Sequence, residues 1–332
     1  MKALVTGANG FLGSWLTKRL LLEGYQVKAL VRKNSDLSEL ADIAGPYTNL
    51  TLAYGDVTQR ESLLQAFAGQ DVIFHLAGVV GYKKYLRPQM DLVNVQGTQN
   101  VVDACQLLQI PKLLHLSSVV AIGSSFKPEI LNEKSSYNIE NLNLGYFETK
   151  RKAEQIVLQA VREKKIEAVC VNPSTIYGFG DAKKGSRKNQ INVARGQMRF
   201  YSAGGVNVVA AEDVVEGILL ALKKGQNGER YILSSENMTI HDLFIKIAHA
   251  AGSKPPEILM PTWLLHTLGW VGDTLSSFGV HKGLSSENAY TATMFHWFDS
   301  SKAQHELGFK PRPADLAIEN SVRWMKDNGY LK

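Results

Sequence analysis

Short apolar segments recur along the first half of the chain, and between them lie segments whose apolar positions repeat with helical spacing. The apolar segments are rich in β-branched residues and predict strands at 2–6, 26–31, 50–53, 71–77, 112–117 and 167–171. The segments with helical spacing include 11–23, 62–68, 92–108 and 146–161. Strands that alternate with helices predict a parallel sheet covered by helices on both faces.

The pattern changes after Pro173. Beyond it we expect a strand at 206–210, a helix at 212–222, a strand at 231–233 and a helix at 240–251. We therefore predict an α/β protein with a Rossmann-type, doubly wound parallel sheet and a smaller mixed α/β lobe. The dinucleotide-binding domain is expected to comprise residues 1–178, with about 206–234 returning to it. The substrate-binding lobe would comprise 179–205 and 235–332.

A glycine-rich turn joins the first expected strand to the first expected helix. Glycines allow a tight turn and a close approach of backbone to phosphate, and the N–H groups at a helix N-terminus can hold a pyrophosphate. The spacing is TGANGFLG rather than the common GxGxxG order. The candidate dinucleotide contacts in this turn are Thr6, Gly7, Asn9, Gly10, Phe11, Leu12 and Gly13.

Two further segments suggest catalytic chemistry. Tyr146 and Lys150 lie one turn apart on one helical face, where an ammonium would favour tyrosinate and lower the phenol pKa from about 10. Ser117 and Ser118 follow a strand, at the edge where parallel sheets bind ligands, and a hydroxyl there can polarise a carbonyl. Each motif alone also fits a surface helix pair or a turn, so the prediction depends on their combination in this chain order.

In these residues the chain resembles the extended short-chain dehydrogenase/reductase superfamily over essentially its whole length. The matching segments are the TGxxGxxG turn, the pair Asp56 and Val57 after the third strand, the HLAG strand end at 75–78, and Asn172 to Ser174. The resemblance implies that Tyr146 is the general acid/base, that Lys150 lowers its pKa and holds the nicotinamide ribose, and that Ser118 orients the substrate oxygen. Asn94 would support a proton-relay water or the helix geometry.

The resemblance also implies contacts to the cofactor. Asp56 would accept a hydrogen bond from the adenine amine, with Val57 against the ring. Close packing is an equally compatible role for the strand end at 76–78. The remaining expected cofactor contacts are Leu76, Ala77, Gly78, Ser117, Pro173 and Ser174.

The end of the second strand bears on the choice of cofactor. Related NAD-binding proteins place a carboxylate there for the ribose 2′-hydroxyl, whereas this chain has Val31 followed by Arg32 and Lys33. Arg32 can hold a 2′-phosphate in a bidentate contact, so NADP is the expected cofactor and NAD remains possible. In the alternative, Arg32 stacks on adenine or faces solvent.

Composition bears on whether the chain is a membrane, nucleic-acid-binding or metal-binding protein. Of 332 residues, 45% are hydrophobic and 20% charged, and no apolar run is long enough for a membrane span, so we expect a cytoplasmic protein. The net charge of +6 comes from scattered basic residues, which argues against nucleic acid. The cysteines and histidines lack ligand spacing, so no metal is predicted, and His75 is expected in the core. For Trp263, Trp270 and Trp297, a substrate pocket, core packing and a membrane-facing surface stay open.

We expect an NADP(H)-dependent oxidoreductase that reduces a ketone or aldehyde, because residues 204–233 look like the bacterial dihydroflavonol reductase-like branch. A sugar-nucleotide epimerase or dehydratase that retains NAD(P) is the alternative, because hopanoid-associated sugar epimerases share this pattern. Such an enzyme could hold a diphosphate with Arg187, Lys188, Arg195 or Arg199, unless these form a solvated face. A non-catalytic NADP-binding redox sensor is disfavoured because Tyr146 and Lys150 are both present. The family expectation is a homodimer through helices 92–108 and 146–161.

Overall fold

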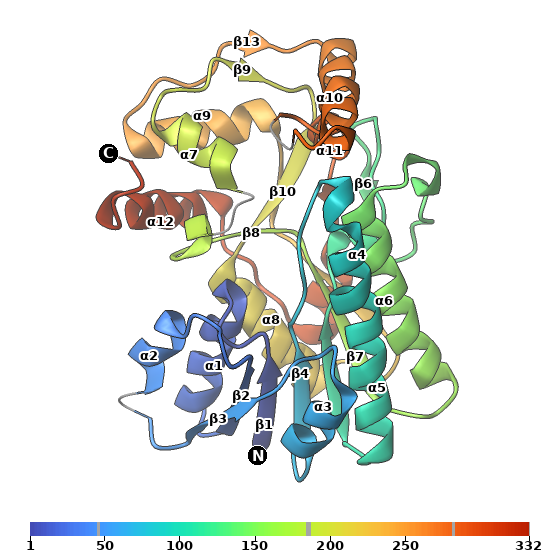
Figure 1. Ribbon diagram of the computed structural model, residues 1–332. Helices are drawn as coiled ribbons and strands as arrows, with labels where there is room; N and C mark the ends of the chain where they lie inside the picture. Colours follow the sequence, from blue (N-terminus) through green and yellow to red (C-terminus); the bar gives the residue numbers. More distant parts are fainter. Residues whose placement is uncertain (45–46, 184–186, 281–282, 332) are drawn as a thin grey trace.

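The computed structural model describes residues 1–44, 47–183, 187–280 and 283–331 of the chain. Its centre is a seven-stranded sheet with the strand order β11-β7-β5-β4-β1-β2-β3, in which every neighbouring pair is parallel (Figure 1). The strands are β1 (Lys2–Thr6), β2 (Gln26–Val31), β3 (Leu50–Tyr54), β4 (Val72–His75), β5 (Lys112–Leu116), β7 (Ala168–Pro173) and β11 (Arg230–Leu233). The predicted Rossmann-type fold is confirmed.

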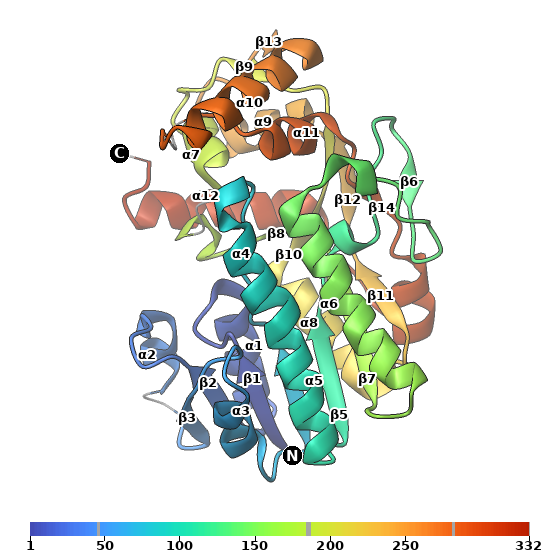
Figure 2. The same ribbon diagram turned by 45° about the vertical axis from the view of Figure 1, so that its right-hand side comes forward.

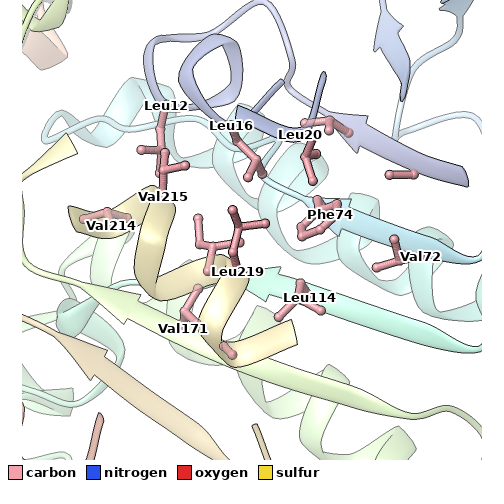
Figure 3. Packing of buried hydrophobic residues seen from close by; sticks show 14 of the residues in the cluster. Leu12, Leu16, Leu20, Val72, Phe74, Leu114, Val171, Val214, Val215 and Leu219 are labelled. Carbon is pink, nitrogen blue, oxygen red and sulfur yellow. The ribbon is translucent and has the colours of Figure 1, made fainter. Parts of the chain in front are cut away.

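Helices cover both faces of this sheet because its central strands are apolar on both sides. One face carries α1 (Phe11–Leu22), α2 (Ser38–Ala44) and α8 (Ala211–Lys224), and the other carries α3 (Arg60–Phe67), α5 (Gly97–Leu107) and α6 (Gly145–Arg162). Figure 3 shows Leu16 of α1 and Leu219 of α8 packed over Phe74 and Leu114 of the sheet. Every residue of β4 and of β7 is buried.

The second lobe is built on a three-stranded sheet with the order β12-β10-β8 (Figures 1 and 2). Its strands are β8 (Thr175–Tyr177), β10 (Gly205–Ala210) and β12 (Glu236–Thr239), and its helices are α7 (Lys188–Ala194), α9 (Ile240–Ala251), α10 (Thr262–Ser277), α11 (Ser286–Thr293) and α12 (Ala314–Asp327). Two small sheets pair β9 (Phe200–Tyr201) with β13 (Ile258–Leu259) and β6 (Ile130–Leu131) with β14 (Trp297–Phe298). Short helical turns occupy Lys84–Leu86, Val119–Ala121, Glu140–Leu142, Asp181–Lys183 and Ala303–Leu307.

One predicted helix begins earlier and is less regular than the sequence pattern indicated. The segment expected at 92–108 is helical to Leu107, but the helical segment begins at α4 (Arg87–Met90) and passes through a π-helical turn, Asp91–Gln96, before α5. A π turn holds one residue more than an α turn, and apolar spacing does not reveal it. The segment 206–234 contributes to both sheets, since β10 pairs with β8 and β11 pairs with β7.

The turn between β1 and α1 depends on close backbone contacts. Gly7 has a positive φ of 69°, and a Cβ atom built on Gly13 would lie 2.0 Å from the Gly7 carbonyl oxygen. A real Cβ atom cannot come so close to a backbone oxygen. The start of α1 can therefore lie against this turn only with glycine at position 13.

Gly13→Ala is expected to lower the free energy of unfolding by about 3 kcal/mol, the upper end of the range for overpacked sites, because the obstructing atom is backbone. Gly69→Ala is the control. Gly69 also has a positive φ, 71°, but no atom lies within 4 Å of the position that a Cβ atom would take there, so about 1 kcal/mol is expected. Urea denaturation measures both variants. Equal stabilities for the two would contradict the packing argument.

Candidate active site

The strand order reverses between β1 and β4, and their carboxyl ends meet at this switch point, where open α/β sheets bind ligands. The Thr6 hydroxyl joins the two ends: Oγ1 accepts hydrogen bonds from the backbone N–H groups of Leu76 and Ala77, both at 3.1 Å, and lies 2.8 Å from His75 Nδ1. His75 Nε2 lies 3.0 Å from Thr98 Oγ1. Burial lowers the pKa of His75 to about 3, so the predicted core histidine is confirmed as a neutral, hydrogen-bonded ring.

The glycine turn fits a dinucleotide phosphate by its shape. A Cβ atom on Gly7 would lie 2.9 Å from the backbone nitrogen of Ala77, so only glycine allows the turn to approach the end of β4. Gly10 precedes α1 and supplies no side chain to cap the helix. The N-terminal end of α1 thus presents backbone donors and the positive end of the helix dipole at the switch point.

Asn94 is buried on the π-helical turn and holds the loop after β4. Its Oδ1 accepts from the Val79 N–H at 2.7 Å, and its Nδ2 donates to the Val79 carbonyl at 2.9 Å and to Thr149 Oγ1 at 3.2 Å. Through Asn94, these contacts join the loop after β4, at Val79, to Thr149 on α6. Of the two roles expected for Asn94, the contacts within the chain correspond to the support of local geometry.

Tyr146 and Ser118 lie together, as the sequence suggested. The Ser118 side chain lies near the Tyr146 phenol, and the Tyr146 ring packs edge-on against Tyr82 with ring centroids 5.9 Å apart. Burial raises the pKa of Tyr146 to about 12, and the nearby Ser118 side chain opposes part of this rise. The expected lowering of the Tyr146 pKa by Lys150 is therefore wrong for this structure.

Lys150 explains the difference. It is buried on α6, and its Nζ donates to the Leu116 carbonyl at the end of β5, at 2.7 Å. Burial lowers the pKa of Lys150 to about 8, against a smaller opposing effect of Glu154. The ammonium thus binds the end of β5, directly before Ser117 and Ser118.

Behind these residues lies a buried carboxylate that the sequence analysis missed. Glu154 Oε2 accepts from Asn172 Nδ2 at 2.5 Å, and Oε1 accepts from Arg230 Nη1 at 3.0 Å. Asn172 Nδ2 also donates to the Ser118 carbonyl at 3.1 Å. Glu154 follows Tyr146 and Lys150 at the same four-residue spacing, a signal that could have revealed it.

Two buried polar atoms at the site have no hydrogen-bond partner among the described residues, Ser117 Oγ and Asn172 Oδ1. Buried polar atoms ordinarily have partners, and such orphans mark places for a ligand or water. Together with the glycine turn they fit a polar, phosphate-bearing cofactor that follows the carboxyl edge of the sheet.

Other predicted cofactor residues are held mainly by the protein. Asp56 Oδ1 accepts from the backbone N–H and the hydroxyl of Thr58, both at 2.9 Å. Val57 is buried, and a Cβ atom on Gly97 would lie 2.8 Å from it. Ser174 Oγ donates to Asn207 Oδ1 at 2.6 Å, which connects the end of β7 to the second lobe.

Two of the four candidate diphosphate ligands are also engaged. The Arg187 guanidinium is buried, lies 3.9 Å from the centroid of the Tyr177 ring, and binds the Ile176 carbonyl and Asp181. Arg195 Nε donates to the Tyr330 carbonyl at 2.8 Å. Lys188 and Arg199 are exposed.

Comparison with known proteins identifies the family of the chain. Residues 3–234 match the model of the NAD-dependent epimerase/dehydratase family. The chain belongs to this family. It is 31% identical to a putative dihydroflavonol 4-reductase from Synechocystis over 99% of this chain and 95% of that protein, and 29% identical to sterol demethylase protein B from Methylococcus capsulatus over the full length of both.

Solved structures of the superfamily share the fold. The crystal structure of gox2253 is 34% identical and covers 99% of both chains with a TM-score of 0.87. DesIV, a dTDP-glucose 4,6-dehydratase from Streptomyces venezuelae, is 20% identical with a TM-score of 0.79, over 99% of this chain and 98% of its own. Membership of the epimerase/dehydratase family and these reductase relatives show an NAD(P)-dependent oxidoreductase of the extended short-chain type.

The depressed pKa of Lys150 predicts a stability effect with a definite sign. Burying the ammonium costs most below about pH 8, and the cost disappears as the pH approaches the ordinary lysine value of 10.5. Lys150→Met is therefore expected to be more stable than the parent by about 1–3 kcal/mol at pH 7, after allowance for the lost hydrogen bond to Leu116.

This advantage should shrink between pH 8 and pH 10 in thermal or urea denaturation. Lys18→Met is the control, because Lys18 is exposed on α1 and its loss should change stability little. A pH-independent effect of Lys150→Met would contradict the argument.

Proposed function

We propose that the chain is an NADP(H)-dependent reductase that converts a ketone or aldehyde to an alcohol. The observation that carries the proposal is the placement of Tyr146 beside Ser118 at the carboxyl end of β5, next to the buried Lys150. A phenol and a hydroxyl that lie side by side can both bond to a single oxygen atom placed between them. A carbonyl oxygen of a substrate suits that position.

Ser118 and Tyr146 have separate roles in the proposed reduction. Ser118 donates to the carbonyl oxygen and polarises it, and Tyr146 gives its proton to that oxygen as negative charge develops there. The nicotinamide cofactor, when bound, supplies the hydride to the carbonyl carbon. With a pKa raised by burial, Tyr146 is protonated at neutral pH and so is in the correct state to act as an acid.

Positioning comes from the surrounding contacts. Lys150 holds the Leu116 carbonyl, and Asn172 holds the Ser118 carbonyl, so the strand end that carries Ser118 is fixed at two points. Tyr82 restricts the other side of the Tyr146 ring. In this proposal Lys150 also binds the nicotinamide ribose, with an ammonium that remains mostly protonated below pH 8.

The reductase proposal is better supported than the epimerase alternative. Relatives of the chain include a putative dihydroflavonol 4-reductase and a 2-alkyl-3-oxoalkanoate reductase from Shewanella oneidensis, the latter 27% identical. Arg187 and Arg195 are bound to protein groups and are poorly placed to hold a sugar diphosphate. The presence of the Tyr146, Ser118 and Lys150 set argues against a sensor without catalysis.

NADP is the proposed cofactor on the basis of charge. Arg32 and Lys33 follow β2 and are exposed, and within the described ranges no group pairs with either side chain. Both cations can therefore bind a 2′-phosphate without first breaking an internal contact.

We also propose a homodimer through α5 and α6. A cavity of about 690 Å³ lies between their outer faces, and its lining includes the apolar Val95, Val102 and Ile156 among polar side chains such as Gln99 and Lys152. A surface that mixes apolar and polar groups in this way is suited to the packing of a second helix pair.

Tyr146→Phe should reduce kcat for NADPH-dependent reduction of aromatic and aliphatic carbonyl compounds by roughly 10²- to 10⁴-fold, because the proton donor is removed while the ring is kept. The measurement is the absorbance of NADPH as it is oxidised, over a panel of such substrates. Tyr25→Phe, far from the site in sequence and fold, is the control for loss of a phenol. An active Tyr146→Phe enzyme would refute the assigned acid.

Arg32→Ala should raise KM for NADPH about 10- to 100-fold and leave KM for NADH nearly unchanged, since a charge-assisted contact to the 2′-phosphate is lost. Arg323→Ala is the matched control, because Arg323 is exposed on α12. Equal effects of Arg32→Ala on the two cofactors would indicate adenine stacking instead of phosphate binding.

A further inference from the structure

The helix α10 exposes large apolar side chains that an ordinary surface helix would bury. Of its 16 residues only Gly269 is buried, whereas Trp263 and Trp270 are 69% and 66% exposed and Phe278, directly after the helix, is 81% exposed. A surface helix normally buries its apolar side and exposes its charges. An apolar side that faces outward points to a binding surface.

Small and polar residues of α10 face the protein. A Cβ atom on Gly269 would lie 2.9 Å from the Cα atom of Ser286, and one on Gly272 would lie 1.9 Å from the Leu284 carbonyl oxygen. The only ionised side chain of α10, Asp273, is bound to Lys84 at 3.0 Å. The exposed side of the helix therefore carries no charge.

Exposed apolar residues continue from α10 into the strand before it. β13 precedes α10 directly and pairs with β9. Figures 1 and 2 both place α10 and β13 at the end of the molecule away from the N-terminus. We call this the α10 surface, and its principal residues are Ile258, Leu259, Trp263, Trp270, Leu275 and Phe278.

We propose that the α10 surface docks on the face of an anionic lipid bilayer. A 16-residue helix is too short to cross a bilayer, for which about 20 residues are needed, and no helix in the described part of the chain is long and apolar enough to do so. A helix with tryptophans on an uncharged apolar side instead lies in the plane of the interface.

The polar groups on the exposed side favour lipid over a protein partner. Thr267 Oγ1 donates to the Trp263 carbonyl and Thr274 Oγ1 to the Trp270 carbonyl, both at 2.9 Å. Both hydroxyls are thus satisfied within the helix and need no donor or acceptor from whatever covers them. A hydrocarbon environment imposes that requirement.

The border of the surface carries the complementary charge for an anionic membrane. The backbone of exposed Arg199 bonds to Ile258, exposed Lys254 lies just before β13, and Lys84 lies beside the end of α10. Because Lys84 is paired with Asp273, Arg199 and Lys254 are the cations of this border that face solvent, beside the acidic Glu257. Basic groups at the rim of an apolar surface add attraction to anionic headgroups.

The α10 surface lies next to the candidate active site. Ser285, between α10 and α11, donates to the Tyr82 carbonyl, and the Tyr82 ring contacts Tyr146. A cavity of about 320 Å³ lies between the 83–85 loop and the end of α10. Docking through α10 would hold this side of the molecule toward the bilayer, whichever carbonyl compound the site reduces.

Flotation of the whole protein with vesicles of equimolar phosphatidylcholine and phosphatidylglycerol tests the proposal without measuring activity. The parent protein should float with these vesicles, and less with phosphatidylcholine alone or at high salt. The double variant Trp263→Ser/Trp270→Ser should partition at least about tenfold more weakly, because two large apolar side chains are removed from the interface.

Leu22→Ser/Leu316→Ser is the matched control, since both leucines are exposed apolar residues outside the α10 surface, and it should bind like the parent. Thermal unfolding checks that both double variants are folded. The proposal is overturned if the parent ignores anionic vesicles, or if loss of the two tryptophans leaves binding unchanged. It is also overturned if light scattering shows that the tryptophans hold a second copy of the chain while vesicles are not bound.

Discussion

The structure depends on a close backbone approach at the point where the strand order of the sheet reverses. The turn after β1 touches both the start of α1, through Gly13, and the end of β4, through Gly7, and neither contact leaves room for a Cβ atom. The Thr6 hydroxyl then ties the two strand ends together. This packing sets the N-terminal end of α1 against the carboxyl edge of the sheet, which makes the edge a place for a phosphate-bearing cofactor.

Burial controls the chemistry of the adjoining residues. It opposes ionisation of both Tyr146 and Lys150, so the phenol keeps its proton and the ammonium holds its proton less tightly than an ordinary lysine. Glu154 adds a buried negative charge. Arg230 neutralises this charge, and Asn172 donates a hydrogen bond to it. The site is thus a connected set of buried polar groups, in which the carboxylate one turn beyond Lys150 supports the residues that would contact substrate.

The family match and the α10 surface lie in different parts of the chain. Membership of the epimerase/dehydratase family covers the sheet and its cofactor edge, through residue 234. The α10 surface lies beyond that range and is built from residues whose apolar character has no use within the fold. An apolar side this exposed is difficult to explain by packing, because α10 already meets α11 through Gly269 and its own polar residues.

The sequence by itself determined the alternation of strands and helices, because apolar spacing follows the burial of each element. The sequence also identified Tyr146, Lys150 and Ser118 as candidate site residues, because each belongs to a motif that is local in the sequence. Only the tertiary structure decided the π turn under Asn94, the raised pKa of Tyr146 and the partners of Glu154, since these depend on groups distant in the chain. It also separated the tryptophans: Trp297 Nε1 bonds to the Met238 carbonyl, whereas Trp263 and Trp270 face outward. A pattern of apolar residues records which side chains avoid water, and tertiary packing decides which of them the protein itself can cover.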